Sequence, residues 1–195
     1  MNGYLLLIAA AIAAYYGAQP STVQVPAVLP PTKPKATPPT GKDYKSLYIA
    51  KCWDNATEVS KEAGWSRDLL LAQSANESDW GRSLLASKYN NLFGIKAGKE
   101  WNGGKTPPLW TSEVINGRSV RVQAPFRSYA NWADSMRDWM DFLKRYPRYF
   151  KAISAAQAGD AAGFFKGLRE AGYATEPDYD TRLASFYQQV QGSIA

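Results

Sequence analysis

The sequence predicts a mainly α-helical domain with a small β-hairpin lobe, preceded by an apolar N-terminal helix and a proline-rich tether. After residue 43, apolar residues recur three and four positions apart over several segments, which indicates amphipathic helices. Residues 109–123 instead form two β-rich runs. The chain has 195 residues, of which 45% are hydrophobic, so it can bury one sizeable core. We therefore expect a single folded domain.

Residues 1–18 are predicted to form the apolar helix. The first 32 residues carry no charged side chain, and residues 4–18 are a continuous apolar run. As a helix this run covers roughly 22 Å, whereas a membrane span crosses about 30 Å of hydrocarbon. It is therefore either a weak anchor or a signal peptide. No Lys or Arg precedes the run, and Tyr16 occupies a position where cleavage after Ala18 requires a small residue, so we favour a retained anchor.

Residues 19–42 are predicted to be a semi-extended tether. They hold seven of the twelve prolines of the chain and show no apolar periodicity. From residue 43 the composition becomes that of a folded domain, which we predict to span residues 43–195. An anchor followed by a tether predicts a domain that reaches a target at a set distance from a membrane.

Two helices are predicted at the start of the domain. Residues 44–63 carry apolar side chains at helical spacing, and Gly64 follows as a C-terminal cap. Ser66 is then a predicted N-cap for a second helix that ends near Gly81.

Glu77 lies near the end of this second helix. Helical spacing places it on one face with Leu70, Gln73 and Trp80, so its carboxyl is expected to lean on apolar and aromatic surface. Desolvation of this kind raises the pKa of a carboxyl and keeps its proton on, as a general acid requires. A glutamate near a helix end also fits a solvated face, and this stretch alone leaves both interpretations open.

The β-hairpin lobe is predicted from residues 109–123. Its two runs are joined by Asn116 and Gly117, the pair most favoured in a type I′ turn. Glu113 alternates onto the same side as Thr111 and Ile115, near the tip of the hairpin. Taken alone, Glu113 fits a surface strand residue.

Three further helices are predicted after the lobe. The first carries an apolar stripe and stops at Pro147. The others span about residues 160–170, with Gly172 beyond, and about residues 178–191. The stripe indicates core packing rather than a cofactor site, and it consists of Trp132, Met136, Trp139, Met140 and Leu143.

Composition excludes several classes of chemistry. The chain has no histidine, which excludes imidazole catalysis and most zinc sites, and we expect no metal and no cofactor. The net charge of +6 favours polyanions such as nucleic acid, anionic lipid or wall polymer. No nucleic-acid-binding module is recognisable, so we expect no nucleic-acid partner. The single Cys52 is expected to be a packing thiol.

Six motifs then occur in a characteristic order. They are LLLAQSANESDWGRS, NNLFGIKA, LWTSEVINGRS, FRSYANWADSM, YPRY and AGYATEPDYDTRL. In these motifs, residues 44–191 resemble the glucosaminidase domains of glycoside hydrolase family 73, which include flagellar peptidoglycan hydrolases, autolysins and phage wall hydrolases. The resemblance implies a lysozyme-like fold that cuts the glycan strand of peptidoglycan after N-acetylglucosamine.

The resemblance also implies three catalytic residues. The helical glutamate of the family falls on Glu77, as general acid, and the β-lobe glutamate falls on Glu113. The tyrosine of GYAT falls on Tyr173. Glu113 either activates a water or, together with Tyr173, orients the N-acetyl group of the substrate for attack. Asn76 departs from the family, which usually has an apolar residue at this position.

Sugar rings present apolar C–H faces that stack on aromatic side chains, although each such side chain fits core packing equally well. The residues that we predict to bind substrate are Trp80, Asn91, Phe93, Tyr129 and Tyr179. Further aromatic candidates are Tyr89, Trp101 and Trp110.

Alternative functions remain open at this stage. A lytic transglycosylase or muramidase of the same superfamily also uses a helical glutamate, and a non-catalytic wall-binding protein would keep the same motifs. The presence of both Glu77 and Glu113 favours an enzyme. The protein is expected either on a membrane with its domain facing the wall, in the periplasm or at the cell surface, or in a phage or virion. Its role is then wall remodelling, phage entry or lysis, and the sequence predicts no oligomeric state.

Overall fold

The computed structural model describes residues 37–115, 118–174 and 176–194. The predicted anchor, residues 1–18, lies outside the described residues, as do residues 19–36 of the tether and the turn residues Asn116 and Gly117. In the part that the structure describes, no helix combines the length and the apolar character that a membrane crossing needs.

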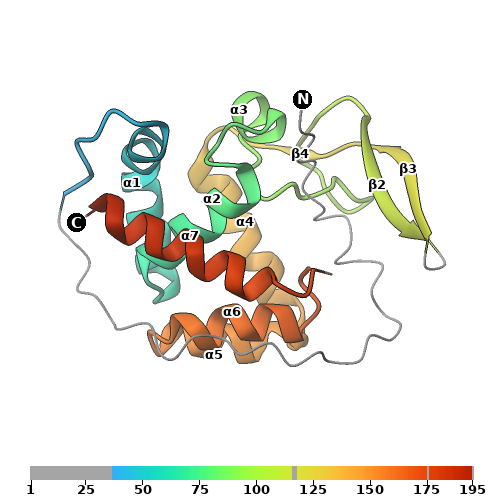
Figure 1. Cartoon of the computed structure of the whole chain (residues 1–195). Helices are drawn as coiled ribbons and strands as arrows, with labels where there is room; N and C mark the ends of the chain where they lie inside the picture. The colour runs from blue at the N-terminus through green and yellow to red at the C-terminus, as the bar shows by residue number, and fades with distance from the viewer. Residues whose placement is uncertain (1–36, 116–117, 175, 195) are drawn as a thin grey trace.

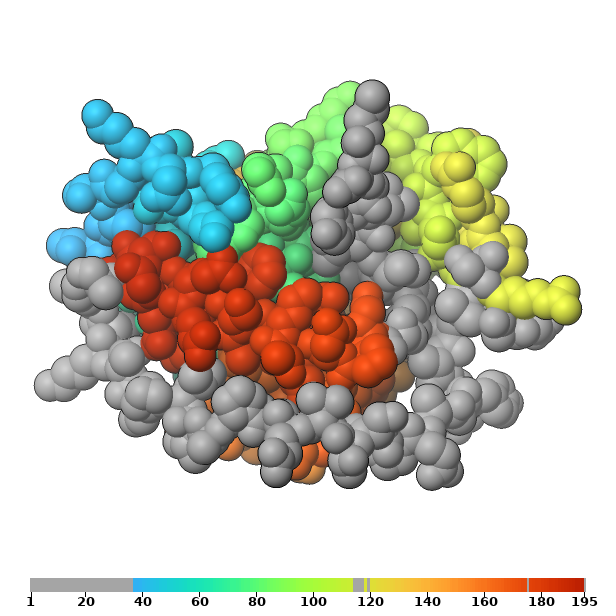
Figure 2. Space-filling view, viewed as in Figure 1, coloured from blue at the N-terminus to red at the C-terminus, as the bar shows by residue number. Residues whose placement is uncertain are grey.

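The described residues form a helical body with a β-lobe at its side, which confirms the predicted fold class. The helices are α1 (Tyr44–Ala63), α2 (Arg67–Ser78), α3 (Leu84–Tyr89), α4 (Trp132–Arg145), η2 (Pro147–Tyr149), α5 (Phe150–Gln157), α6 (Ala161–Glu170) and α7 (Tyr179–Ile194). The strands are β1 (Gly104–Lys105), β2 (Leu109–Ile115), β3 (Arg118–Ala124) and β4 (Arg127–Ser128). Figure 1 shows α7 across the front of the body, with α1 on one side and the β2–β3 hairpin on the other. In the space-filling view the yellow hairpin likewise stands apart from the red surface of α7 (Figure 2).

Helix α1 begins and ends at well-formed caps. The carboxylate of Asp43 accepts hydrogen bonds from the backbone N–H groups of Lys45 and Ser46. Gly64 has a φ of 70°, which glycine adopts without strain. The buried face of α1 includes Cys52, and burial raises the pKa of this thiol to about 12. The structure thus confirms Cys52 as a packing residue.

Helix α2 is buried along its whole length and packs against α1 and α7. The prediction that it continues to near Gly81 is wrong, because the helix ends at Ser78. Asp79, Trp80 and Gly81 have φ values of 52°, 55° and 74°, which a right-handed helix cannot contain. The polar side chains of such a buried helix, including Glu77, need hydrogen-bond partners inside the protein.

The predicted hairpin is present as β2 and β3. The strands pair antiparallel in a register that sets Glu113 opposite Val120 and Ile115 opposite Arg118. Sequence analysis does not predict β1 and β4, which form a second, two-residue ladder. An isolated bridge between Lys96 and Phe126 lies beside it. These short pairings attach the lobe to the helical body.

The helices after the lobe follow the prediction with two additions, η2 and α5. Helix α4 ends at Arg145, just before Pro147, and α6 and α7 occupy the two later predicted segments. Helix α5 is not predicted, since its eight residues are too few to show a clear period. It packs closely on α6, because a Cβ on Gly167 would lie 2.9 Å from the Cα of Ala152.

Candidate active site

Glu77 lies in the last turn of α2, and only 5% of its surface is exposed. One carboxyl oxygen, Oε1, accepts three hydrogen bonds. The hydroxyl of Tyr179 donates at 2.8 Å, Nε2 of Gln73 at 3.0 Å and Nδ2 of Asn76 at 3.2 Å. The carboxyl is therefore fixed in the protein interior by groups from α2 and α7.

Burial raises the pKa of Glu77 from its ordinary value of 4.5 to about 7. The hydrogen bonds from Tyr179 and Asn76 and the positive charge of Arg182 act in the opposite direction, while the negative charge of Glu176 adds to the rise. The structure thus favours the desolvated interpretation of Glu77 over the solvated one. At neutral pH a substantial fraction of the carboxyl holds its proton, as a general acid requires.

Trp80 lies beyond the end of α2 and packs against other aromatic rings. The indole ring lies 5.3 Å from the ring of Phe186, in a stacked pair, and 5.8 Å from that of Tyr48, edge to face. Trp80 is a buried packing residue of the α1–α7 side, which speaks against its predicted role in binding substrate.

Gln73 forms hydrogen bonds with both Glu77 and Tyr179. Its Nε2 donates to Glu77 and, at 2.8 Å, to the hydroxyl of Tyr179. Its Oε1 is buried and has no hydrogen-bond partner among the described residues. The opposite amide orientation would place that oxygen against the carboxyl of Glu77, so the observed one gives the ionised acid an additional donor. Sequence analysis did not assign this role, although the spacing of four residues on a helix signals it.

The two tyrosines of the GYATEPDY segment both lie in the interior. Tyr179, in the first turn of α7, contacts the acid directly. Tyr173 accepts a hydrogen bond from Nε1 of Trp139 at 2.8 Å, and its ring centroid lies 5.7 Å from that of Tyr179. Burial, together with the negative charge of Glu77, raises the pKa of both hydroxyls well above the ordinary value. Tyr173 lies in the turn between α6 and α7, and its side chain is buried in the hydrophobic core.

Glu113 lies on β2, outside the helical body, with 34% of its side chain exposed. Its carboxylate forms an ion pair with Lys96, which is held near the lobe by the bridge to Phe126. Among the described residues, no hydrogen bond or ion pair joins Glu113 to Glu77. The structure thus places the two predicted catalytic carboxyls on different parts of the fold and does not bring them into contact.

Two predicted substrate-binding residues, Phe93 and Asn91, are buried in the structure. Phe93 is fully buried and stacks on Trp139 with ring centroids 4.7 Å apart. Asn91 is also buried, and its amide bonds the backbone of Ile95 and the carbonyl oxygen of Arg127. Burial and these contacts speak against direct stacking of a sugar on either side chain.

Tyr129 is the one residue of the predicted binding set that reaches the surface. Its hydroxyl donates to Asp138 at 2.6 Å, and its ring lies edge-on to Trp101 at 5.8 Å. The guanidinium of Arg127 binds the same aspartate and lies 4.4 Å from the centroid of the Trp101 ring. These side chains form a partly exposed group at the base of the lobe, held together by the shared Asp138 and by ring contacts.

Trp110 is the most exposed of the other aromatic candidates on the lobe, with 55% of its surface accessible. Strand alternation puts it on the opposite face of β2 from Glu113.

Among the described residues, no group of three acidic or cysteine side chains is arranged to hold a metal ion.

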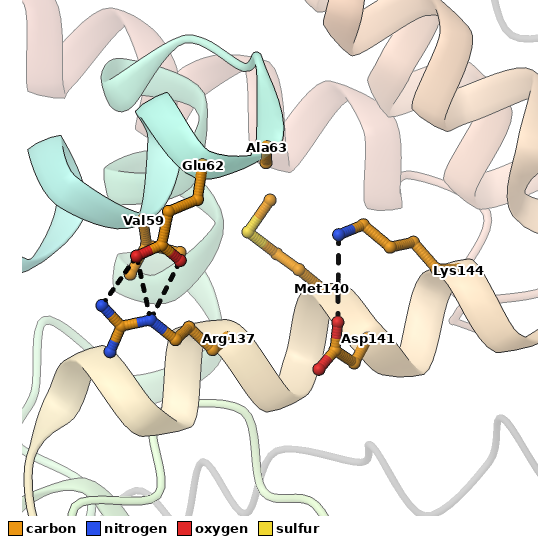
Figure 3. A pocket seen from close by; sticks show the side chains of 7 residues that line it. All are labelled: Val59, Glu62, Ala63, Arg137, Met140, Asp141 and Lys144. Carbon is orange, nitrogen blue, oxygen red and sulfur yellow. Dashed lines mark hydrogen bonds and ion pairs between the residues drawn. The ribbon is translucent and has the colours of Figure 1, made fainter.

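A separate small pocket lies between α1 and α4, with a volume of about 120 Å³. Figure 3 shows Glu62 and Arg137 paired on one side of it and Asp141 and Lys144 paired on the other, around Met140. None of the predicted site residues lines it. Its charged groups neutralise one another, so we assign it no part in the chemistry.

A mainly helical domain with a buried, proton-holding glutamate at the end of a central helix and a second glutamate on a β-lobe is a lysozyme-like glycoside hydrolase fold. Residues 53–192 match the model of the glucosaminidase family, described as mannosyl-glycoprotein endo-beta-N-acetylglucosaminidase, and the chain belongs to this family. The family membership that the six motifs indicate is thereby confirmed.

Known proteins of the family are similar over most of the chain. The peptidoglycan hydrolase FlgJ of Vibrio parahaemolyticus is 38% identical over 156 residues, which are 78% of this chain and 50% of that protein. The exo-glucosaminidase LytG of Bacillus subtilis is 33% identical over 75% of this chain and 52% of its own length. The chain thus spans about half the length of these curated relatives. A crystal structure of a truncated glycoside hydrolase domain of Salmonella typhimurium FlgJ covers 77% of this chain and 99% of its own, with 34% identity and a TM-score of 0.61.

Proposed function

We propose that this protein is a peptidoglycan hydrolase that cuts the glycan strand at N-acetylglucosamine, as an endo-β-N-acetylglucosaminidase. The observation that carries this proposal is the buried carboxyl of Glu77, whose pKa of about 7 suits a general acid near neutral pH. The names of the similar proteins, peptidoglycan hydrolase and exo-glucosaminidase, support the choice of substrate. A net charge of +6 also suits an anionic wall polymer.

In the proposed reaction, Glu77 gives its proton to the oxygen of the leaving sugar. Because Oε1 accepts three hydrogen bonds, the proton of the neutral acid lies on the other oxygen, Oε2. When the proton leaves, the donors from Tyr179, Gln73 and Asn76 are already aimed at the new carboxylate. The developing negative charge is therefore stabilised without any rearrangement of the protein.

Glu113 acts from the lobe in this proposal. Cleavage forms an oxocarbenium-like centre, which needs a negative partner, a base for water or a neighbouring N-acetyl group. The ion pair with Lys96 holds the Glu113 carboxylate at the lobe, ready for one of these tasks. Tyr173, buried behind the acid, positions the Tyr179 side of the site and does not itself contact the sugar.

The products released from purified peptidoglycan test the proposal. After incubation with the protein and borohydride reduction, mass spectrometry should find new fragments that end in reduced N-acetylglucosamine. Reduced muramic ends would indicate a muramidase, and anhydro-muramic ends a lytic transglycosylase. Short oligosaccharides support endo cleavage, whereas single terminal units support exo cleavage. Binding to the wall without any release would leave only a wall-binding role.

We propose further that the protein works at the cell wall from a membrane, to which residues 1–18 attach it. The support is the uncharged apolar run followed by the proline-rich tether. Intact-mass measurement of the native protein in the membrane fraction should give a chain that begins at or next to Met1. A soluble chain that begins near Gln19 would show a cleaved signal peptide instead. Wall remodelling in a host and wall penetration by a phage both fit this arrangement.

A further inference from the structure

The side chain of Asn76 lies between the acid and a cation. Its Nδ2 donates to Oε1 of Glu77 at 3.2 Å, and its Oδ1 accepts from Nε of Arg182 at 3.1 Å. Both ends of the amide are used, so its orientation is fixed, with the NH2 group toward the carboxyl and the oxygen toward the guanidinium. Asn76 is buried and Arg182 is partly buried, which keeps water from competing strongly for these bonds.

The packing of α7 on α2 produces this arrangement. Arg182 follows Tyr179 by three residues and so lies on the same face of α7. Its guanidinium carbon is 5.4 Å from the centroid of the Tyr179 ring. The beginning of α7 therefore brings two groups to the acid, a direct donor in Tyr179 and, through Asn76, the cation of Arg182.

The other groups around Glu77 do not replace that cation. Tyr173 and Tyr179 are neutral hydroxyls, since burial raises the pKa of each. Glu176, just before α7, adds negative charge. Asp180 on α7 is bound to Arg169 of α6 and so is already paired.

We propose that Asn76 and Arg182 are positioning residues for the general acid, in which Arg182 orients the Asn76 amide and Asn76 presents an N–H group to the carboxyl of Glu77. This inference rests on the proposed role of Glu77. Asn76 and Arg182 then help to set the pH range in which the enzyme is active. Burial favours the neutral carboxyl and the pair favours the carboxylate, so together they set the point at which the acid ionises.

Asn76→Leu and Arg182→Gln, made in the full chain, test the pair. Leucine branches at Cγ as asparagine does, with two methyl groups in place of the amide oxygen and nitrogen, so it has no N–H donor. We expect the alkaline limb of the pH–rate profile on peptidoglycan to move to higher pH in both variants, by about half a pH unit to one unit. The double variant should move the limb by less than the sum of the two shifts, because Arg182 acts partly through Asn76. Arg182→Lys keeps the charge but not the planar Nε–H group, so it should shift the alkaline limb by less than Arg182→Gln does.

A second measurement does not depend on activity. The carbon-13 resonance of the Glu77 side-chain carboxyl, followed by NMR, should show its titration midpoint rising in the same variants. Arg137→Gln is the matched control, because it removes one positive charge on α4, where Arg137 pairs with Glu58 and Glu62. The control should leave both the alkaline limb and the midpoint unchanged.

Two outcomes would overturn the inference. One is an unchanged Glu77 titration midpoint in both variants, and the other is a shift in Arg137→Gln as large as the shift in those variants. If Asn76→Leu does not fold, the partly exposed Arg182→Gln carries the test alone. An active Glu77→Gln enzyme would sink the proposed function, while the NMR midpoint would still show whether Asn76 and Arg182 control the carboxyl. A dead Glu77→Gln enzyme with unshifted variants would remove only the inference.

Discussion

The two glutamates of this domain lie in regions of opposite character. Glu77 is in the interior, on a helix that is buried throughout, and three donors from α2 and α7 converge on one of its oxygens. Glu113 is on a hairpin outside the helical body, about a third exposed, with an ion pair to Lys96. Core packing therefore fixes the first carboxyl, whereas the position of the second depends on a two-stranded lobe.

Under the proposed function, the difference predicts a division of labour. A proton donor benefits from low dielectric and fixed geometry, because both hold its pKa near the working pH. The second carboxylate acts from the side of the substrate opposite the acid, so the site must open for the glycan strand to bind. A lobe that closes over the bound substrate allows this. We therefore expect changes at Glu77 to affect chemistry and pH dependence strongly, and changes at Glu113 to affect turnover with little effect on stability.

The largest effect is expected from Glu77→Gln. Glutamine keeps the size and the acceptor oxygen of the side chain, so the fold and wall binding should survive. Release of fragments from purified peptidoglycan should fall by a factor on the order of a hundred or more, because the proton donor is lost. Near-normal turnover in a folded variant would break the comparison between the two carboxyls.

The same variant should also change how stability depends on pH. The folded protein raises the pKa of Glu77 from 4.5 to about 7, so between these values the native state binds more protons than the unfolded chain. The free energy of unfolding of the wild type should therefore fall as pH rises through this window, by about 2 to 3 kcal/mol relative to Glu77→Gln. Urea denaturation of both proteins at about pH 4.5 and about pH 8 measures this difference in unfolding free energy. The same difference at both pH values would mean that the carboxyl ionises in the folded protein as it does in the unfolded chain.

Tyr173→Phe should lower stability, although Tyr173 is itself in the GYAT motif. It removes the acceptor of the buried Trp139 Nε1–H group, which costs about 1 to 3 kcal/mol, or several degrees in Tm. Tyr146→Phe is the matched control on an exposed ring and should change Tm little. Equal Tm values for Tyr173→Phe and the wild type would contradict the core role assigned to Tyr173.

The smallest change in free energy is expected at the lobe. Glu113→Gln should lower turnover about tenfold or more and shift Tm by little, because a partly exposed ion pair contributes only about 0 to 1 kcal/mol. Lys96→Met, which removes the partner and keeps Glu113, should have a similarly small effect on Tm. Full activity of Glu113→Gln beside a dead Glu77→Gln would indicate that one carboxylate suffices, and would favour the transglycosylase alternative.

Local patterns in the sequence determined most of the fold. Helical periodicity and caps such as Gly64 predict α1, α2, α4, α6 and α7, and the strand pattern of residues 109–123 predicts the hairpin. These signals depend on neighbours within a few residues of one another, so they are visible in the chain itself. Short elements such as α5, β1 and β4 are too brief to carry such a pattern, and tertiary contacts decide them.

The chemistry of the site is divided in the same way. The sequence singled out Glu77 and the family to which the chain belongs, but it predicted Trp80 as the neighbour of the acid. Three consecutive residues with positive φ end α2 before Trp80, whose ring packs on Phe186 and Tyr48, and only the packed backbone reveals this. Tyr179, which donates to Glu77, and Arg182, which donates to Asn76, are more than a hundred residues from these partners along the chain and reach them because α7 packs on α2. Sequence periodicity shows which residues share a helix face, whereas contacts between helices far apart in the chain arise only when the core closes.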